Sequence, residues 1–205
     1  MMLESLVASL ITGGIRLLTG VHARWVGCVP SNVQRVYFAN HASHVDFILI
    51  WCVLPRYLRK RTRPAAASDY WTRGAIRRYL IHRVFRGVLI ARGNFGREQN
   101  PVAVMGRAVD EGASLILFPE GTRGPGGQVQ PFKAGVYHLA QTYANLELVP
   151  VWIDNAYRVM PKGVPLPVPL LCSVAFGKPL RLEPGEQKPE FLDRLRQSLI
   201  ELGCA

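Results

Sequence analysis

The stretch that decides the fold spans residues 36–47 and runs VYFANHASHVDF. Its first four residues, Val36–Ala39, form an apolar run typical of a buried strand, and Val45–Leu58 behind them has the apolar periodicity of a helix. The polar side chains of Asn40–Asp46 therefore lie at the connection from a strand to a helix.

On either side of this junction, short apolar runs alternate with longer segments of helical periodicity. Further strands are expected at Val88–Ala91, Leu115–Phe118, Leu148–Ile153 and Ser173–Phe176. Further helices are expected at Tyr70–Phe85, Pro101–Glu111, Phe132–Ala144 and Pro189–Leu202. This alternation predicts an α/β fold with a mixed, largely parallel sheet and helices on its faces. A chain of 205 residues has room for one sizeable core, so we expect residues 1–205 to form a single domain.

Residues 1–20 precede this pattern with an apolar stripe at the three- and four-residue spacing of an amphipathic helix. A signal peptide is not expected, because no positive charge precedes the apolar run and its first charged residue is Glu4. Arg16 interrupts the run, which is also shorter than the ~20 residues of a membrane span. Two interpretations remain open: a helix packed on the protein's own core, and an anchor in the membrane interface.

The formal net charge of +11 comes from one part of the chain. Between Arg56 and Arg97 there are twelve Arg or Lys residues and one acid, Asp69, whereas the remainder has thirteen of each sign. A surface of one sign attracts anionic lipid, phosphorylated substrates, acidic carrier proteins or nucleic acid. Nucleic acid is the least favoured of these, because no reading helix or stacking-aromatic motif accompanies the charge. A solvated face that serves solubility is the alternative.

The four cysteines, Cys28, Cys52, Cys172 and Cys204, stand singly, without CxxC spacing or a neighbouring His cluster. No metal site is therefore predicted. Cys52 and Cys172 fall inside apolar runs, where a free cysteine behaves as a small core residue, and this usage favours a reducing, cytoplasmic compartment.

The first group of residues that could carry chemistry is His41 and Asp46. Within one straight helix their five-residue separation would put the side chains about 140° apart, so the helix has to begin after His41. Ser43 and Asp46 have capping-box spacing, which predicts Ser43 as the N-cap and Asp46 in the first turn. The His41 imidazole can then fold back onto the Asp46 carboxylate and keep its second nitrogen free to take a proton. His44 is a rival base, and an Asp46 that only caps the helix is the alternative without chemistry.

The second group runs PEGTR over residues 119–123, directly after an expected strand. Gly121 lets the backbone approach a ligand closely, and the planar guanidinium of Arg123 suits a phosphate. Lys133 follows near an expected helix start, where backbone N–H groups also favour an anion. A surface turn with a solvated arginine is the alternative.

Each polar group directly follows an expected strand: Asn40–Asp46 the first, Arg92 the second and Pro119–Arg123 the third. In α/β sheets, ligand sites form where loops leave the carboxyl ends of the strands. The sequence therefore predicts a ligand site at that edge.

Taken together, NHASHVDF at residues 40–47 and FPEGTR at residues 118–123 resemble two motifs of the glycerol-phosphate and 1-acylglycerol-3-phosphate acyltransferase family. The resemblance extends over residues 36–153. It implies that His41, rather than His44, is the catalytic general base and that Asp46 orients it. The residues it assigns to binding the phosphorylated acceptor are Glu120, Gly121, Thr122 and Arg123.

Two further motifs resemble the family less closely. Arg92 is similar to the arginine of the second motif, although Ala91 stands where many members have a polar or acidic residue. Val149–Val151 resembles the fourth motif, which is implicated in the acyl side of the site.

The resemblance implies an O-acyltransferase of phospholipid biosynthesis that moves a fatty acyl group to the hydroxyl of 1-acylglycerol-3-phosphate. The donor would be acyl-CoA or acyl carrier protein, and no cofactor or metal is expected. The expected location is the cytoplasmic face of a membrane with anionic lipid, as a peripheral or monotopic protein. Other acceptors stay open, among them glycerol 3-phosphate, another lysophospholipid, an acylated amino acid and a lipid A precursor. A non-catalytic protein that binds anionic membrane is the alternative from another class.

Overall fold

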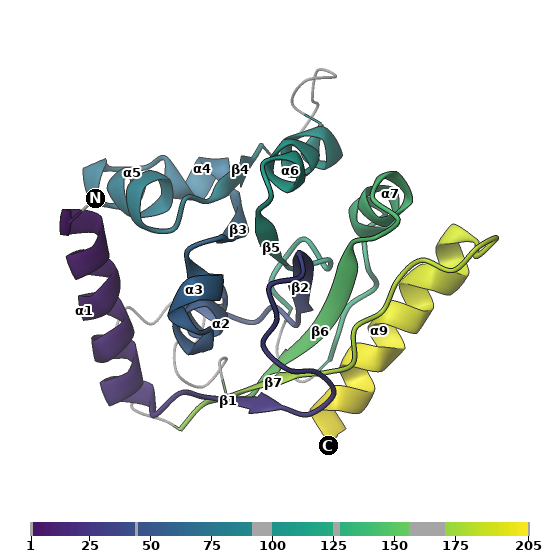
Figure 1. The fold of residues 1–205 in the computed structure, drawn as a ribbon, viewed down its shortest axis with the longest axis horizontal. Coiled ribbons are helices and arrows are strands. Elements are labelled where there is room, and N and C mark those ends of the chain that lie inside the picture. Colours follow the sequence, from purple (N-terminus) through teal and green to yellow (C-terminus); the bar gives the residue numbers. More distant parts are fainter. Residues whose placement is uncertain (1, 44, 92–99, 125–127, 156–170, 205) are drawn as a thin grey trace.

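The computed structural model describes residues 2–43, 45–91, 100–124, 128–155 and 171–204 (Figure 1). Within these ranges, seven strands form one sheet in the order β1-β7-β6-β2-β5-β3-β4. Their bounds are β1 His22–Trp25, β2 Arg35–Ala39, β3 Thr62–Ala67, β4 Val88–Ile90, β5 Ser114–Leu117, β6 Glu147–Ile153 and β7 Ser173–Phe176. Strands β6, β2, β5, β3 and β4 are parallel, whereas β7 is antiparallel to β6 and β1 pairs in parallel with β7. The expected mixed, largely parallel sheet is confirmed.

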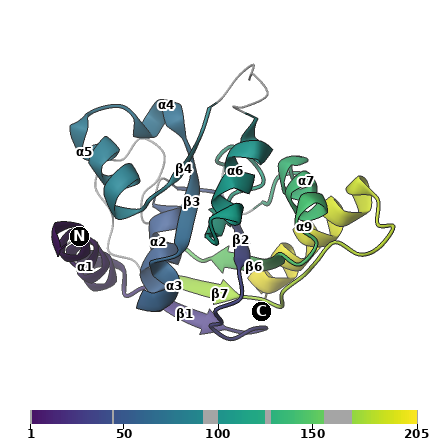
Figure 2. The same ribbon diagram turned by 45° about the horizontal axis from the view of Figure 1, so that its top comes forward.

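Helices cover both faces of this sheet, and α1 and α9 stand at opposite ends of the molecule in Figures 1 and 2. Their bounds are α1 Met2–Thr19, α2 Asp46–Val53, α3 Arg56–Arg59, α4 Ser68–Trp71, α5 Ala75–Tyr79, the π-helix η1 Leu80–Val84, α6 Pro101–Asp110, α7 Gly135–Thr142 and α9 Lys188–Cys204.

Strand β2 shows how the sheet divides the core, because successive side chains of a strand point to opposite faces. Tyr37 and Ala39 belong to a cluster with α2 and η1, against which α1 packs. Val36 and Phe38 belong to a second cluster with α6, α7 and α9. All residues of β2 are buried, so the polar loop that follows it leaves from the middle of the sheet.

Two expected helices are each divided. Val45–Leu58 forms the separate helices α2 and α3. A proline disfavours the helical conformation in the residue before it, and Leu54 before Pro55 is extended at φ −61°, ψ 139°. Tyr70–Phe85 is divided at Gly74, which has a φ of 81° between α4 and α5.

Two strands, β1 and β3, were not expected from the sequence. β3 has the sequence TRPAAA, in which Thr62 is the one residue of the branched and aromatic kinds typical of strands. It pairs with β5 through residues 62–64 and with β4 through residues 65–67, so tertiary pairing rather than intrinsic preference makes it a strand.

Helix α1 divides its apolar side chains between two faces. Val7, Ile11 and Ile15 pack against the protein's core, which confirms one of the two interpretations of residues 1–20. The other face exposes leucines: Leu3, Leu6, Leu10 and Leu17. By length and composition α1 is also apolar enough to cross a membrane, although it was expected to be too short and interrupted. The exposed leucines form the apolar face that an anchor in the membrane interface requires.

Part of the basic run is engaged in contacts within the protein. Several of its arginines make contacts within the protein: Arg59 with Thr12 and the Trp51 ring, Arg61 with the Asn32 and Gly112 carbonyls, Arg63 with Glu111, and Arg83 with Glu4. These contacts spread over several elements, so part of the basic run also joins pieces of the fold.

Candidate active site

The loops that follow β2 and β5 meet at one edge of the sheet. The two strands are parallel neighbours, with Val36 opposite Leu115 and Phe38 opposite Leu117. Beyond them, the His41 N–H donates to Oε1 of Glu120 at 2.8 Å, and the Gly124 N–H donates to the His41 carbonyl at 2.9 Å. The predicted convergence of these two groups at the carboxyl ends of the strands is confirmed.

The imidazole of His41 contacts the carboxylate of Asp46. Nδ1 of His41 lies 2.8 Å from Oδ2 of Asp46, and the two side chains are 20% and 1% exposed. A ring nitrogen that faces a carboxylate carries the proton, so Nδ1 is the donor and Nε2 is left basic. The imidazole also stacks on Phe118, with ring centroids 4.2 Å apart. The ring is thus held on two sides, and Nε2 has no hydrogen-bond partner among the described residues.

The start of α2 differs from the expected capping box. The helix begins at Asp46 with Val45 as its N-cap and no side-chain cap bond, so the prediction of Ser43 as N-cap is wrong. The reason is that Asp46 reaches backward: its Oδ2 accepts the N–H groups of Ala42 and Ser43 at 2.8 Å each. The carboxylate orders the turn before the helix, and a negative charge at the first helical residue is also favoured by the helix dipole. His44, the rival base, lies outside the described residues.

Glu120 points into the protein. It is 4% exposed, and its two carboxylate oxygens accept main-chain N–H groups, Oε1 from His41 and Oε2 from Gln130 at 2.9 Å. Burial raises the pKa of the Glu120 carboxyl, while the hydrogen bonds from Gln130 and His41 oppose that shift.

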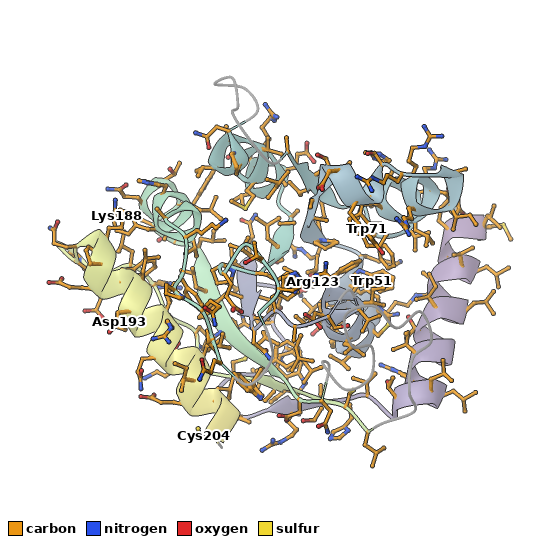
Figure 3. The ribbon with its side chains drawn as sticks, turned by 180° about the vertical axis from the view of Figure 1, so that it is seen from behind. Trp51, Trp71, Arg123, Lys188, Asp193 and Cys204 are labelled. Carbon is orange, nitrogen blue, oxygen red and sulfur yellow. The ribbon has the colours of Figure 1, made fainter. Side chains whose placement is uncertain are left out.

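Gly121 brings a cationic side chain over the same loop. Its φ is 72°, a conformation that favours glycine, and an added Cβ would lie 2.7 Å from Nζ of Lys133. The Lys133 N–H in turn donates to the Pro119 carbonyl at 2.8 Å. Thr122 and Arg123 are exposed, and Figure 3 shows Arg123 well away from α9. Neither Lys133 nor Arg123 forms an ion pair with a residue that the structure describes.

Two site features were not identified from the sequence. The amide of Asn40 exchanges two hydrogen bonds with the main chain of Ile153, at 3.1 and 2.9 Å, and so fixes the loop to the end of β6. The stacking of Phe118 on His41 is the second. The sequence signal that could have pointed to them is their position, because Asn40 and Phe118 each belong to one of the two motifs. Val149–Val151 lies within β6 and is buried, and Arg92 lies outside the described residues.

Two hollows differ in the chemistry of their linings. A small cavity of about 20 Å³ adjoins the motifs and is lined by Asn40, His41, Ala42, Glu120, Gln128, Val129 and Trp152. A larger one of about 430 Å³ is lined by Val33, Gln34, Val109, Thr142, Tyr143, Ala144, Asn145 and Leu146. These residues come from the segment before β2, from α6, and from the stretch between the end of α7 and the start of β6. Only the first holds an imidazole paired with a carboxylate, so chemistry rather than volume selects it.

This chain is similar to acyltransferases. The sequence model of a family described as Acyltransferase matches residues 27–154. A 1-acyl-sn-glycerol-3-phosphate acyltransferase from Cocos nucifera is 30% identical over 77% of this chain and 49% of its own length. Proteins of the same name from Limnanthes alba and Haemophilus influenzae are 29% and 26% identical, over 88% and 68% of this chain. The chain spans about half to three-fifths of the length of these relatives.

The fold is similar to a solved structure. The crystal structure of the 1-acyl-sn-glycerophosphate (LPA) acyltransferase PlsC from Thermotoga maritima aligns with a TM-score of 0.75 and 21% identity. The alignment covers 98% of this chain and 80% of that one, so the likeness extends to the whole architecture, α1 included.

Proposed function

Because the chain belongs to the acyltransferase family, we propose that it moves a fatty acyl group from an acyl thioester to the free hydroxyl of 1-acylglycerol-3-phosphate. The names of its relatives support this acceptor. The observation that carries the proposal is the 2.8 Å contact between His41 Nδ1 and Asp46 Oδ2, which leaves a basic nitrogen beside two cations, Arg123 and Lys133, that form no ion pair with any described residue.

His41 acts as the general base. Its Nε2 takes the proton of the acceptor hydroxyl while that oxygen attacks the thioester carbonyl carbon. Asp46 stabilises the imidazolium that forms. When the tetrahedral intermediate collapses, the C–S bond breaks and the imidazolium returns its proton to the departing thiolate. The acyl group thus passes directly to the acceptor, and general-base assistance of this kind contributes roughly 10²- to 10⁴-fold.

Arg123 and Lys133 bind the phosphate of the acceptor. Both are exposed, neither is neutralised by a described acid, and Gly121 lets Lys133 lie close to the backbone of the motif. Arg92 joins them by resemblance to the second motif. Thr122 is a neutral neighbour that can donate a hydrogen bond to a phosphate oxygen.

The acyl donor is a thioester of coenzyme A or of acyl carrier protein, and the acceptor is drawn from a membrane with anionic lipid. The exposed leucines of α1 support a peripheral or monotopic attachment, because such a face loses its contact with water in a bilayer interface. Cys28, Cys52, Cys172 and Cys204 are free thiols, which supports the cytoplasmic face.

The test is to incubate the purified protein with acyl-CoA or acyl carrier protein thioester and to identify the products by mass. Lysophosphatidic acid, glycerol 3-phosphate and other lysophospholipids serve as competing acceptors. We expect phosphatidic acid as the main product and its loss in His41→Ala, while His138→Ala, an exposed histidine on α7, keeps full activity. Product from another acceptor alone would overturn the assigned substrate. Salt-sensitive vesicle binding without thioester consumption would instead support a non-catalytic membrane protein.

A further inference from the structure

Glu120 belongs to the loop to which the resemblance assigns the acceptor, yet its carboxylate is already engaged. The side chain is 4% exposed, and each of its oxygens accepts a main-chain N–H, from His41 at 2.8 Å and from Gln130 at 2.9 Å. These two donors belong to segments 79 and 10 residues away in the chain. Glu120 therefore joins three pieces of backbone.

The main chain of His41 is held at both of its polar atoms by this loop. Its N–H donates to Glu120, and its carbonyl accepts the Gly124 N–H at 2.9 Å. The imidazole is meanwhile fixed by Asp46 and by stacking on Phe118. Because both the ring and the backbone of His41 are held, the position of its Nε2 is fixed as well.

Direct contact with a phosphate would be unfavourable for Glu120. A carboxylate and a phosphate are both anions, and an inward-pointing carboxylate cannot turn outward without taking the acceptor away from two part-buried N–H groups. A buried charge is itself costly unless it is hydrogen-bonded, and charge-assisted bonds to backbone N–H groups are among the strong ones. The observed arrangement satisfies that condition.

We infer that Glu120 is a positioning residue: its ionised carboxylate fixes the backbone of His41 and thereby the point from which the ring takes the acceptor proton. This inference rests on the proposed function and gives Glu120 a different role from the acceptor contact that the resemblance implies. The acceptor phosphate is then left to the cations of the loop.

The test compares Glu120→Gln with Glu120→Asp. Glutamine has nearly the same shape but only one acceptor oxygen, so one of the two N–H groups faces an NH₂ donor. We expect Glu120→Gln to lower kcat by roughly 10- to 100-fold with the acceptor KM within about twofold, because a shift of ~1 Å at a reacting group has an effect of that size. Glu120→Asp keeps both oxygens and should recover part of kcat.

A second readout does not depend on turnover. The ring signals of the histidines are followed by NMR in the full-length wild type and in both variants. We expect Glu120→Gln to shift the signals of His41 and to leave those of His22, His82 and His138 unchanged, which general loosening of the fold would not do. Unchanged His41 signals would overturn the inference, as would a raised acceptor KM with kcat retained.

The two proposals fail in different ways. If the wild type transfers no acyl group to any acceptor, the proposed function fails, whereas the NMR comparison still decides whether Glu120 positions His41. If Glu120→Gln does not fold, both measurements are made on Glu120→Asp instead: kcat compared with the acceptor KM, and the NMR signals of the histidines.

Discussion

Oδ2 of Asp46 lies 2.8 Å from Nδ1 of His41, although Asp46 is the first residue of a helix and His41 stands in the loop before it. The same oxygen accepts the N–H groups of Ala42 and Ser43, so one carboxylate both shapes the loop and faces the ring. The spacing of five residues follows from this geometry, because the loop has to turn back far enough to bring the ring over the helix start.

Asp46→Asn is expected to separate these two tasks. The asparagine oxygen can still accept the Ala42 and Ser43 N–H groups, so the melting temperature should change little. The neutral amide stabilises an imidazolium far less than a carboxylate does, so kcat should fall roughly 10²- to 10⁴-fold. Steady-state kinetics and thermal unfolding measure the two effects. Asp193→Asn, on the exposed side of α9 (Figure 3), is the matched control, and retention of full kcat by Asp46→Asn would contradict the assigned role.

Lys133→Met should weaken acceptor binding with little effect on kcat. Methionine keeps an unbranched side chain over Gly121 but removes the ammonium group. A hydrogen bond to a charged group contributes about 1.5–3 kcal/mol, so the acceptor KM should rise roughly 10- to 100-fold. Kinetics with the acceptor varied at saturating thioester measure this change.

The control for Lys133→Met is Lys188→Met, an exposed lysine at the start of α9 (Figure 3), for which no change is expected. An unchanged acceptor KM in Lys133→Met would remove this lysine from the phosphate site.

The central part of the sheet could be predicted from the sequence because its strands are buried on both faces and are rich in branched residues. Val36–Ala39 and the run ending at Phe118 show this most clearly, since their pairing brings the two motifs together. β3 could not be predicted in this way, because its alanines and Pro64 become a strand only between two existing partners.

The site was predictable as far as residue types and spacing determine it. The contact between His41 and Asp46 follows from a helix that begins between them, and the structure confirms that contact. The direction of Glu120 does not follow from any local pattern, because it depends on a main-chain N–H ten residues further along the chain. The error at Ser43 has a similar cause: Asp46 turns toward the loop and not into a reciprocal cap.

Cys52 and Cys172 should resist thiol reagents in the folded protein at pH 8. Burial raises the pKa of each thiol to about 11, and only the thiolate reacts, so both remain protonated well above neutral pH. Cys204 is exposed and should be modified first. Mass spectrometry after brief alkylation, with and without denaturant, measures the order. Modification of Cys52 or Cys172 as fast as Cys204 in the folded protein would contradict the burial of these thiols.

Substitution by glutamine should have different effects on the two faces of α1. Leu6 and Leu10 are 57% and 66% exposed, so replacing both with glutamine should leave the melting temperature unchanged. Burying a leucine contributes about 1.5–3 kcal/mol, so the double substitution should weaken binding to vesicles containing anionic lipid by at least roughly tenfold if this face enters the interface. Ile11→Gln, on the packed face, should instead lower the melting temperature.

Vesicle sedimentation and thermal unfolding of the same preparations measure both effects. Activity toward a detergent-dispersed acceptor should survive Leu6→Gln with Leu10→Gln, because neither residue belongs to the proposed site, while activity toward acceptor in vesicles should fall together with binding. Vesicle binding that is unaffected by the double substitution but abolished by salt would assign the attachment to the arginines alone and leave α1 as a helix of the core.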